Sequence, residues 1–141
     1  MENYLIIGAS GYIGSALYKY SINNNLLVTG TSTKGSKRYL PFNLENPKNL
    51  KEINLNKYSC VFFAAAISSP DICSKEHVYA KEINVKKTSE IINTFLEKGI
   101  KVIFLSSDTV YGEQINPFNE KMQANPLGDY ALMKYQVEKK I

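Results

Sequence analysis

The sequence has little of what marks a secreted, membrane-spanning or disulfide-rich protein. Its 141 residues include two cysteines, too few for a disulfide scaffold. No apolar run is long enough to cross a bilayer. The start, MENYLIIGASGY, lacks the basic region and the long apolar stretch of a signal peptide. A cytoplasmic protein with no membrane partner is therefore expected.

The basic residues are not arranged for nucleic-acid binding. The chain carries 17 basic and 13 acidic side chains, a net charge of +4. Its basic clusters, at 34–38 and 134–140, are modest, and no basic stripe is interleaved with aromatic residues. We expect no nucleic-acid partner, and we interpret 134–140 as a solvated helix face.

The cysteines do not predict a metal site. Cys60 lies in the apolar run YSCVFFAAA, which predicts a buried small side chain. Cys73 and His77 stand four residues apart and could share a helix face. Two ligands without a nearby carboxylate or third nitrogen make a weak site, so helix packing is the favoured interpretation and no metal is expected.

Short apolar runs alternate with helical stretches along the chain. Its length of 141 residues suits one domain with a single core, and a hydrophobic content of 44% predicts that the chain folds. Strands are predicted at 3–8, 26–31, 38–44, 59–66 and 101–107. Helices are predicted at 11–22, from Asn46 and Pro47 onward, across 70–98 up to Gly99, and from 126 or 127. The helix at 11–22 places apolar side chains on one face: Ile13, Ala16, Leu17 and Tyr20. This alternation predicts an α/β fold, a Rossmann-type doubly wound parallel sheet over residues 1–141, with helices on both faces.

The segment GASGYIG lies between the first predicted strand and the first predicted helix. It supplies Gly8, Gly11 and Gly14. Gly8 permits the tight turn, Gly11 lets backbone N–H groups approach a pyrophosphate, and Gly14 allows the helix to pack closely on the sheet. The helix N-terminus adds unsatisfied donors and a partial positive charge. Nucleotide binding is favoured over a glycine turn without a ligand.

The end of the second predicted strand bears on the choice between NAD and NADP. An acidic residue there would accept hydrogen bonds from the ribose of NAD. The segment GTSTKGSKR has none, and four side chains could instead hold a 2′-phosphate: Thr33, Lys34, Lys37 and Arg38. A solvated basic loop is the alternative, so the sequence only leans toward NADP.

Taken together, these motifs resemble one family from end to end. The ordered set GASGYIG, FNL, FFAAA, INVKKT, LSSDTVYG and NPLGDYALMKYQVE resembles the extended short-chain dehydrogenase/reductase family, the NAD-dependent epimerases and dehydratases of nucleotide sugars. Within it, the branch of dTDP-4-dehydrorhamnose reductase is the most similar. The resemblance implies a sheet of about five strands in the order 3-2-1-4-5. It also implies cofactor contacts for Gly8, Ser10, Gly11, Tyr12, Ile13, Gly14, Thr33, Lys34, Asn43, Leu44, Ala64, Ala65, Ala66, Ser106, Tyr130 and Lys134.

The resemblance also implies a catalytic triad. Ser107 matches its Ser or Thr, and Tyr130 and Lys134 match its Tyr-x-x-x-Lys pair. A free tyrosine has a pKa near ~10, and a lysine ammonium one helical turn away is expected to lower that value. Ser107 would then hold the substrate oxygen while Tyr130 donates or accepts the proton. Taken alone, Tyr130 and Lys134 would fit an amphipathic surface helix.

Three neighbouring positions refine this prediction. The 4,6-dehydratases carry Asp followed by Glu, whereas here Asp108 is followed by Thr109, which disfavours dehydration. Asp108 is expected to accept a hydrogen bond that fixes its loop. Asn84 and Glu120 match family positions for which we expect structural roles.

Relatives of this kind continue past the catalytic helix into a domain that grips the nucleotide-sugar. The resemblance therefore implies that 1–141 covers about the cofactor half, with the substrate-binding domain absent and little activity in isolation. A homodimer through the helix bearing Tyr130 and Lys134 would follow. The alternative is a non-catalytic NAD(P)-binding module used for sensing or assembly.

Overall fold

The computed structural model describes residues 2–113 and 117–141. The chain divides into two compact units. The first runs up to Ala66 and includes Glu90–Leu105, and the second comprises Ile67–Ser89 and Ser106–Ile141. The loop predicted before the last helix includes positions 114–116, which lie outside the described residues. No helix in the described part of the chain is both long and apolar enough to span a membrane.

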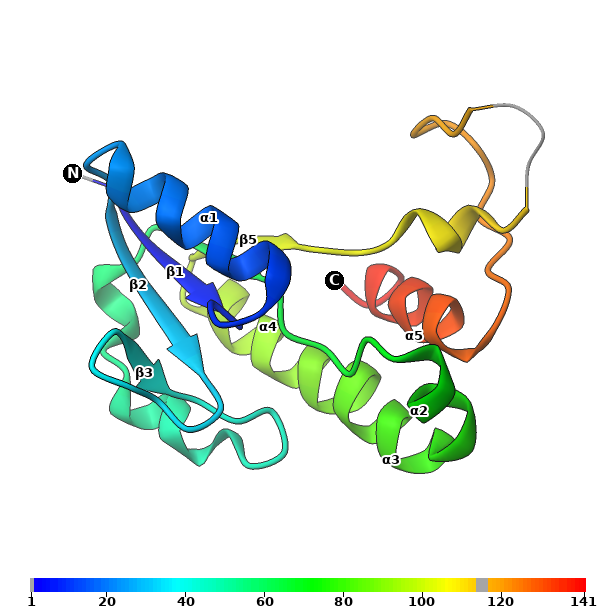
Figure 1. The fold of residues 1–141 in the computed structure, drawn as a ribbon, viewed down its shortest axis with the longest axis horizontal. Coiled ribbons are helices and arrows are strands. Elements are labelled where there is room, and N and C mark those ends of the chain that lie inside the picture. The colour runs from blue at the N-terminus through cyan, green and yellow to red at the C-terminus, as the bar shows by residue number, and fades with distance from the viewer. Residues whose placement is uncertain (1, 114–116) are drawn as a thin grey trace. The chain divides into compact units, whose positions relative to one another are not determined.

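The first unit is built on a five-stranded parallel sheet (Figure 1). Its strands are β1 (Asn3–Ile7), β2 (Leu27–Ser32), β3 (Tyr39–Pro41), β4 (Cys60–Phe63) and β5 (Lys101–Phe104). Their order is β3-β2-β1-β4-β5, so the predicted fold class and strand order are confirmed. The last three strands each end three residues earlier than predicted, because the chain leaves the ladder there to form loops.

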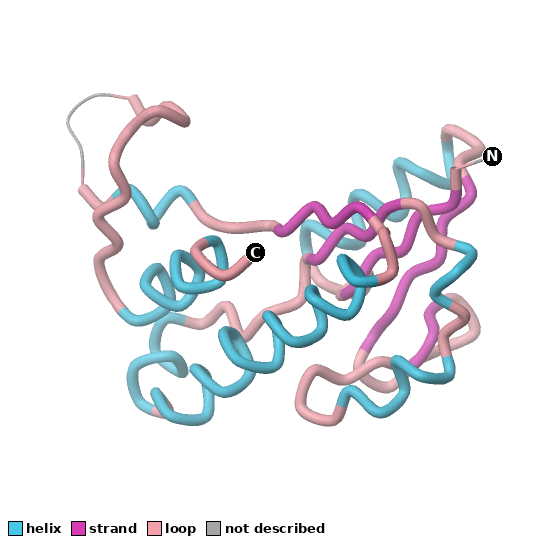
Figure 2. The backbone as a smooth tube through the Cα atoms, turned by 180° about the vertical axis from the view of Figure 1, so that it is seen from behind, coloured by secondary structure: helices cyan, strands magenta, loops and turns pink. Residues whose placement is uncertain are grey.

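Helices cover both faces of this sheet (Figures 1 and 2). One face carries α1 (Tyr12–Asn23). The other carries η1 (Pro47–Glu52), η2 (Leu55–Lys57) and, from Glu90 onward, α4 (Thr88–Glu97). A central strand between two helical layers must be apolar on both faces. The run Leu5–Ile7 in β1 is accordingly fully buried.

Two details of the first unit differ from the sequence-based predictions. Ile13 and Tyr20 are 58% and 63% exposed, and the buried residues of α1 are Gly14 and Ser21. Small residues at this spacing of seven let the helix axis approach the sheet closely, so the predicted apolar face is not the packing face. The helix predicted after Asn46 is a 3₁₀ helix, and the amide of Asn43 accepts the local N–H of Glu45 at 3.0 Å.

The second unit is mainly helical. It contains α2 (Pro70–Lys75), α3 (His77–Lys81), the π-helical η3 (Glu82–Lys87), η4 (Asp108–Tyr111) and α5 (Asp129–Glu138). The prediction of helical structure in pieces across 70–98 is confirmed, and Gly99 follows with φ of +71°. The last helix starts two or three residues later than predicted, because Gly128, with φ of +85°, precedes it as a non-helical cap.

Candidate cofactor and catalytic sites

Two of the three motif glycines are required by the protein's own packing. Gly8 has φ of +88°, and a Cβ there would lie 2.8 Å from the Ala65 nitrogen. A Cβ on Gly14 would lie 2.2 Å from the Gly8 carbonyl oxygen. Neither contact can be relieved by moving a flexible side chain. The tight turn and the close helix packing predicted for these two glycines are therefore present.

Gly11 is different, because nothing around it in the protein requires a glycine. Its φ of −75° and ψ of 173° are accessible to any residue. A Cβ there would contact only the Gly8 oxygen, at 3.4 Å. The position is exposed, so the space that a side chain would fill remains open in front of the loop. This is the room that a pyrophosphate needs to approach the backbone, and the loop therefore fits a dinucleotide.

The N-terminus of α1 opens onto the same space. Among the described residues, no side chain caps its first N–H groups, and its first turn holds no acidic residue. The side chains of Ser10, Tyr12 and Ile13 are exposed here, and that of Tyr12 is 95% exposed. Unsatisfied N–H groups and the helix dipole make this end attractive to an anion.

Thr31 fixes the glycine loop, a role that sequence reasoning missed. This β2 residue is fully buried. Its hydroxyl accepts the N–H of Gly8 at 3.2 Å and donates to the carbonyl of Ile6 at 3.3 Å. Its own carbonyl accepts the N–H of Ala9 at 2.8 Å. Thr29, Gly30 and Ser32 surround Thr31 in β2, so no local pattern singled it out.

The remaining predicted cofactor residues of the first unit lie in three loops. Thr33, Lys34, Lys37 and Arg38 are exposed in the loop after β2. Ala64, Ala65 and Ala66 follow β4 and are half-buried, with Ala65 against Gly8. Leu44 is buried, and the Asn43 amide is engaged in its own turn.

In the second unit, Ser107 is the N-cap residue that precedes η4. Its Oγ accepts the N–H of Thr109 at 3.3 Å, and the Thr109 hydroxyl lies 2.8 Å away. The Ser107 hydroxyl also lies 3.3 Å from Oδ1 of Asp108, which accepts from it. Asp108 therefore accepts a hydrogen bond within this loop, as expected.

Tyr130 and Lys134 lie one turn apart on α5, and the Lys134 Nζ is 5.8 Å from the centre of the Tyr130 ring. Lys134 is only 4% exposed, and burial lowers its pKa to about 8, against an opposing effect of Glu138. Burial, with a smaller effect of Cys73, raises the pKa of Tyr130. The predicted lowering of the Tyr130 pKa is therefore wrong for the chain alone, because desolvation of the phenol dominates.

Two further polar residues hold this unit together. Ser106, for which the resemblance implies a cofactor contact, donates its hydroxyl to the Glu138 carboxylate. Asn84 is 4% exposed within the π-helical η3. Its amide donates to the carbonyl of Ile67 at 2.9 Å and accepts the N–H of Ile67 at 2.8 Å. The sequence suggested a structural role for Asn84, and these two bonds describe one.

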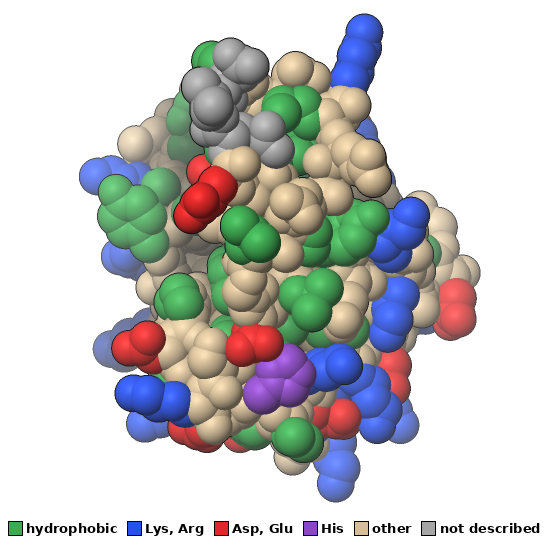
Figure 3. Space-filling view, turned by 90° about the vertical axis from the view of Figure 1, so that its right-hand side faces the viewer, with side chains coloured by type: hydrophobic (Ala, Val, Ile, Leu, Met, Phe, Trp, Pro, Cys, Tyr) green, Lys and Arg blue, Asp and Glu red, His purple; other side chains and the backbone are tan. Residues whose placement is uncertain are grey.

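Cys73 and His77 do not share a helix, since α2 ends between them. The Cys73 thiol is buried and donates to the Ile67 carbonyl at 3.3 Å. His77 Nδ1 lies 3.0 Å from Oδ1 of Asp129, and Figure 3 shows this single histidine, in purple, at the surface of the unit. Within residues 2–113 and 117–141, no group of three potential ligands could hold a metal ion.

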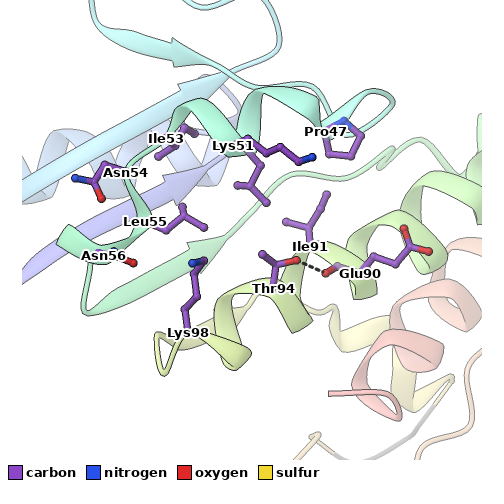
Figure 4. Close-up of a pocket in the computed structure, with 11 residues that line it drawn as sticks. Pro47, Lys51, Ile53, Asn54, Leu55, Asn56, Glu90, Ile91, Thr94 and Lys98 are labelled. Carbon is purple, nitrogen blue, oxygen red and sulfur yellow. Dashed lines mark hydrogen bonds between the residues drawn. The ribbon is translucent and has the colours of Figure 1, made fainter.

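A separate cavity of about 590 Å³ lies in the first unit, between η1, η2 and α4 (Figure 4). Its floor is aliphatic, formed by Leu50, Ile53, Leu55 and Ile91. Lys51 and Lys98 also line it. Among the described residues, no predicted site residue borders this cavity, so it is distinct from the glycine loop.

Residues 4–141 match the NAD dependent epimerase/dehydratase family, and the chain belongs to this family. The family-level resemblance is thereby confirmed. Methionine adenosyltransferase 2 subunit beta of Xenopus tropicalis is 28% identical over 139 residues, covering 97% of this chain and 42% of the relative. ADP-L-glycero-D-manno-heptose-6-epimerase of Brachyspira hyodysenteriae is 29% identical over 153 residues, covering 96% and 46%. The chain therefore spans less than half the length of these relatives.

Solved structures agree with the fold. MoeE5 in complex with UDP-glucuronic acid and NAD has a TM-score of 0.81 and 25% identity, covering 97% of this chain and 47% of MoeE5. A hypothetical dTDP-4-dehydrorhamnose reductase from Sulfolobus tokodaii has a TM-score of 0.83 and 23% identity, covering 97% and 50%. At 23% identity, the second likeness establishes the common fold.

Proposed function

We propose that this chain is the cofactor-binding half of an NAD(P)-dependent nucleotide-sugar oxidoreductase, a 4-keto reductase or an epimerase. The main support for this proposal is that Gly11 is exposed and that the protein's own packing does not require a glycine there. Family membership and the bound NAD of MoeE5 support the same cofactor class. In this proposal, the domain that grips the nucleotide-sugar lies outside residues 1–141.

The chain's residues have separate tasks in this proposal. The loop of Gly8, Gly11 and Gly14 binds the pyrophosphate, and the α1 N-terminus adds its donors. When bound, the nicotinamide supplies or accepts the hydride. Ser107 Oγ orients the substrate oxygen, and the Tyr130 hydroxyl gives or takes the proton there. Lys134 places a positive charge beside the Tyr130 ring.

Calorimetry with NADH on the wild type and on Gly11→Ala tests the proposed cofactor site. The added methyl group fits the protein but fills the space of the pyrophosphate, so we expect an intact fold and at least about tenfold weaker binding. Lys19→Ala, farther along α1, is the matched control and should bind as the wild type does. Absence of NADH and NADPH binding at millimolar concentration would remove the basis of the proposal.

The preference for NADP is part of the proposal and rests on the loop after β2. Its exposed basic side chains, among them Lys34 and Arg38, could pair with a 2′-phosphate. We expect NADPH to bind more tightly than NADH. The double variant Lys34→Ala/Arg38→Ala should bring the two dissociation constants closer together. Tighter binding of NADH by the wild type would refute this preference.

A non-catalytic NAD(P)-binding module is the second candidate. One relative is named as the beta subunit of an adenosyltransferase, which is the name of an assembly component. Ser107, Tyr130 and Lys134 favour the enzyme, because a module that only binds does not need all three. Reading the coding sequence past Ile141 discriminates the two, since an open frame with a substrate domain would rule out the module.

A homodimer through the helix that bears Tyr130 and Lys134 is also proposed. Leu132, on α5 between these residues, is 40% exposed and offers an apolar contact. Sedimentation equilibrium should show self-association that Leu132→Glu weakens. A monomer at all accessible concentrations would rule out dimerisation of this chain by itself.

A further inference from the structure

The helix α5 carries a third polar group in line with the proposed catalytic pair. Glu138 follows Lys134 by one turn, as Lys134 follows Tyr130. Its carboxylate is partly buried and accepts the hydroxyl of Ser106, 32 residues away in the sequence. This hydrogen bond attaches the end of α5 to the segment that leads into Ser107.

Glu138 also acts on Lys134 through its charge. The Lys134 side chain is almost fully removed from water, which disfavours its charged form. The Glu138 carboxylate opposes this effect and stabilises the ammonium. Cys73 of α2 acts on Tyr130, on the same helix as the pair, and both groups are neutral at pH 7. The carboxylate of Asp129, at the start of α5, also acts on Cys73.

A buried ammonium without a compensating charge would lose its proton or leave its place. We infer that Glu138, anchored by Ser106, is a positioning residue that keeps the charged Lys134 beside Tyr130. This inference rests on the proposed function, in which Lys134 serves the proton transfer at Tyr130. It assigns Ser106 to the support of the catalytic helix, in place of the cofactor contact suggested by resemblance.

The test is an NMR titration of the Lys134 side chain in the cofactor-free protein, with labelled lysine. Glu138→Gln retains the size and the acceptor for Ser106 but removes the charge. It should lower the Lys134 pKa by about one unit, a roughly tenfold larger acid dissociation constant. Ser106→Ala retains the Glu138 charge and removes the hydrogen bond that anchors it. This variant should also lower the Lys134 pKa, by less than Glu138→Gln does.

A control at another carboxylate separates the effect of the Glu138 charge from a general disturbance of the fold. Glu82→Gln removes a carboxylate that pairs with Lys86 in the same unit and should leave Lys134 unchanged. If Glu138→Gln does not fold, Glu138→Asp takes its place. Its shorter side chain withdraws the carboxylate from Lys134, so the Lys134 pKa must again fall.

A Lys134 titration that is identical in wild type and Glu138→Gln would overturn the inference. The result does not depend on NAD(P) binding, which calorimetry measures separately on the same proteins. Loss of NADH binding by the wild type would therefore count against the proposed function, while the titration alone decides the contribution of Glu138.

Discussion

At the scale of single residues, positions that look equivalent in the motif GASGYIG are occupied by glycine for different physical reasons. Gly14 is required because the helix and the turn leave no space for a methyl group. A Cβ on Gly11 would meet only the Gly8 oxygen, at 3.4 Å, and in the proposed function this glycine lets the cofactor come close to the backbone. In that proposal, the motif contains one residue that serves stability and one that serves binding.

Gly14→Ala is expected to destabilise the chain by about 2–4 kcal/mol. The new Cβ meets backbone atoms, so the loss outweighs the roughly 1 kcal/mol that alanine gains over glycine inside a helix. Urea unfolding followed by circular dichroism measures the change. Gly11→Ala is the matched control, and a loss as large as that of Gly14→Ala would contradict the packing difference between them.

Lys134→Met is expected to stabilise the chain at pH 7. The pKa of Lys134 falls from 10.5 to about 8 on folding. Holding the buried ammonium therefore costs on the order of 3 kcal/mol, which a methionine of similar size avoids. Because the folded-state pKa is depressed, the wild type gains stability as the pH rises from about 8 toward 10.5.

The advantage of Lys134→Met should therefore shrink between pH 7 and pH values near 10, as urea unfolding at both values can show. Lys139→Met, at an exposed position of the same segment, should give neither the gain nor the pH dependence. An advantage that does not change with pH would mean that the burial of the charge is not its cause.

At the scale of elements, the π-helical turn of η3 brings a polar side chain into the interior. Asn84 lies in this segment and satisfies both backbone groups of Ile67. Single π-helical turns often occur at functional sites. Through these two hydrogen bonds, the Asn84 side chain of η3 fixes the segment that follows β4.

Asn84→Ala is expected to cost about 2–3 kcal/mol, because it leaves the Ile67 N–H without its partner and removes one donor to the Ile67 carbonyl. Amide hydrogen exchange should become faster at Ile67 in particular. Asn93→Ala, at an exposed position of α4, is the control and should be nearly neutral. Unchanged exchange at Ile67 would show that these two bonds do not hold the loop.

At the scale of the whole molecule, the chain spans 42–46% of the length of two of its relatives. A chain that holds only the cofactor site should still be stabilised when the cofactor binds. We expect saturating NAD(P)H, at about 100 times its dissociation constant, to stabilise the chain by about 2.7 kcal/mol and to raise its melting temperature.

A nucleotide-sugar such as UDP-glucose should then add no further shift, because the proposed substrate-gripping domain lies outside this chain. Differential scanning fluorimetry with each ligand alone and with both distinguishes the two effects. An additional shift with the sugar nucleotide would show that residues 1–141 bind the substrate by themselves, and the proposed division of labour would be wrong.

The sequence by itself determined the parallel sheet and the glycine turn, because these follow from local periodicity and from short motifs. The strand order came from the resemblance to the family. The sequence also placed Ser107, Tyr130 and Lys134 as candidates, through resemblance. It misjudged the packing face of α1, since the small residues Gly14 and Ser21 carry no apolar signal.

Only the tertiary structure decided the electrostatics and the supporting contacts. The direction of the Tyr130 pKa depends on burial, and the contact of Ser106 with Glu138 joins residues 32 positions apart. Thr31 supports Gly8 across 23 positions in the same way. Desolvation and long-range hydrogen bonds arise when distant segments pack together, and no local pattern of residues encodes them.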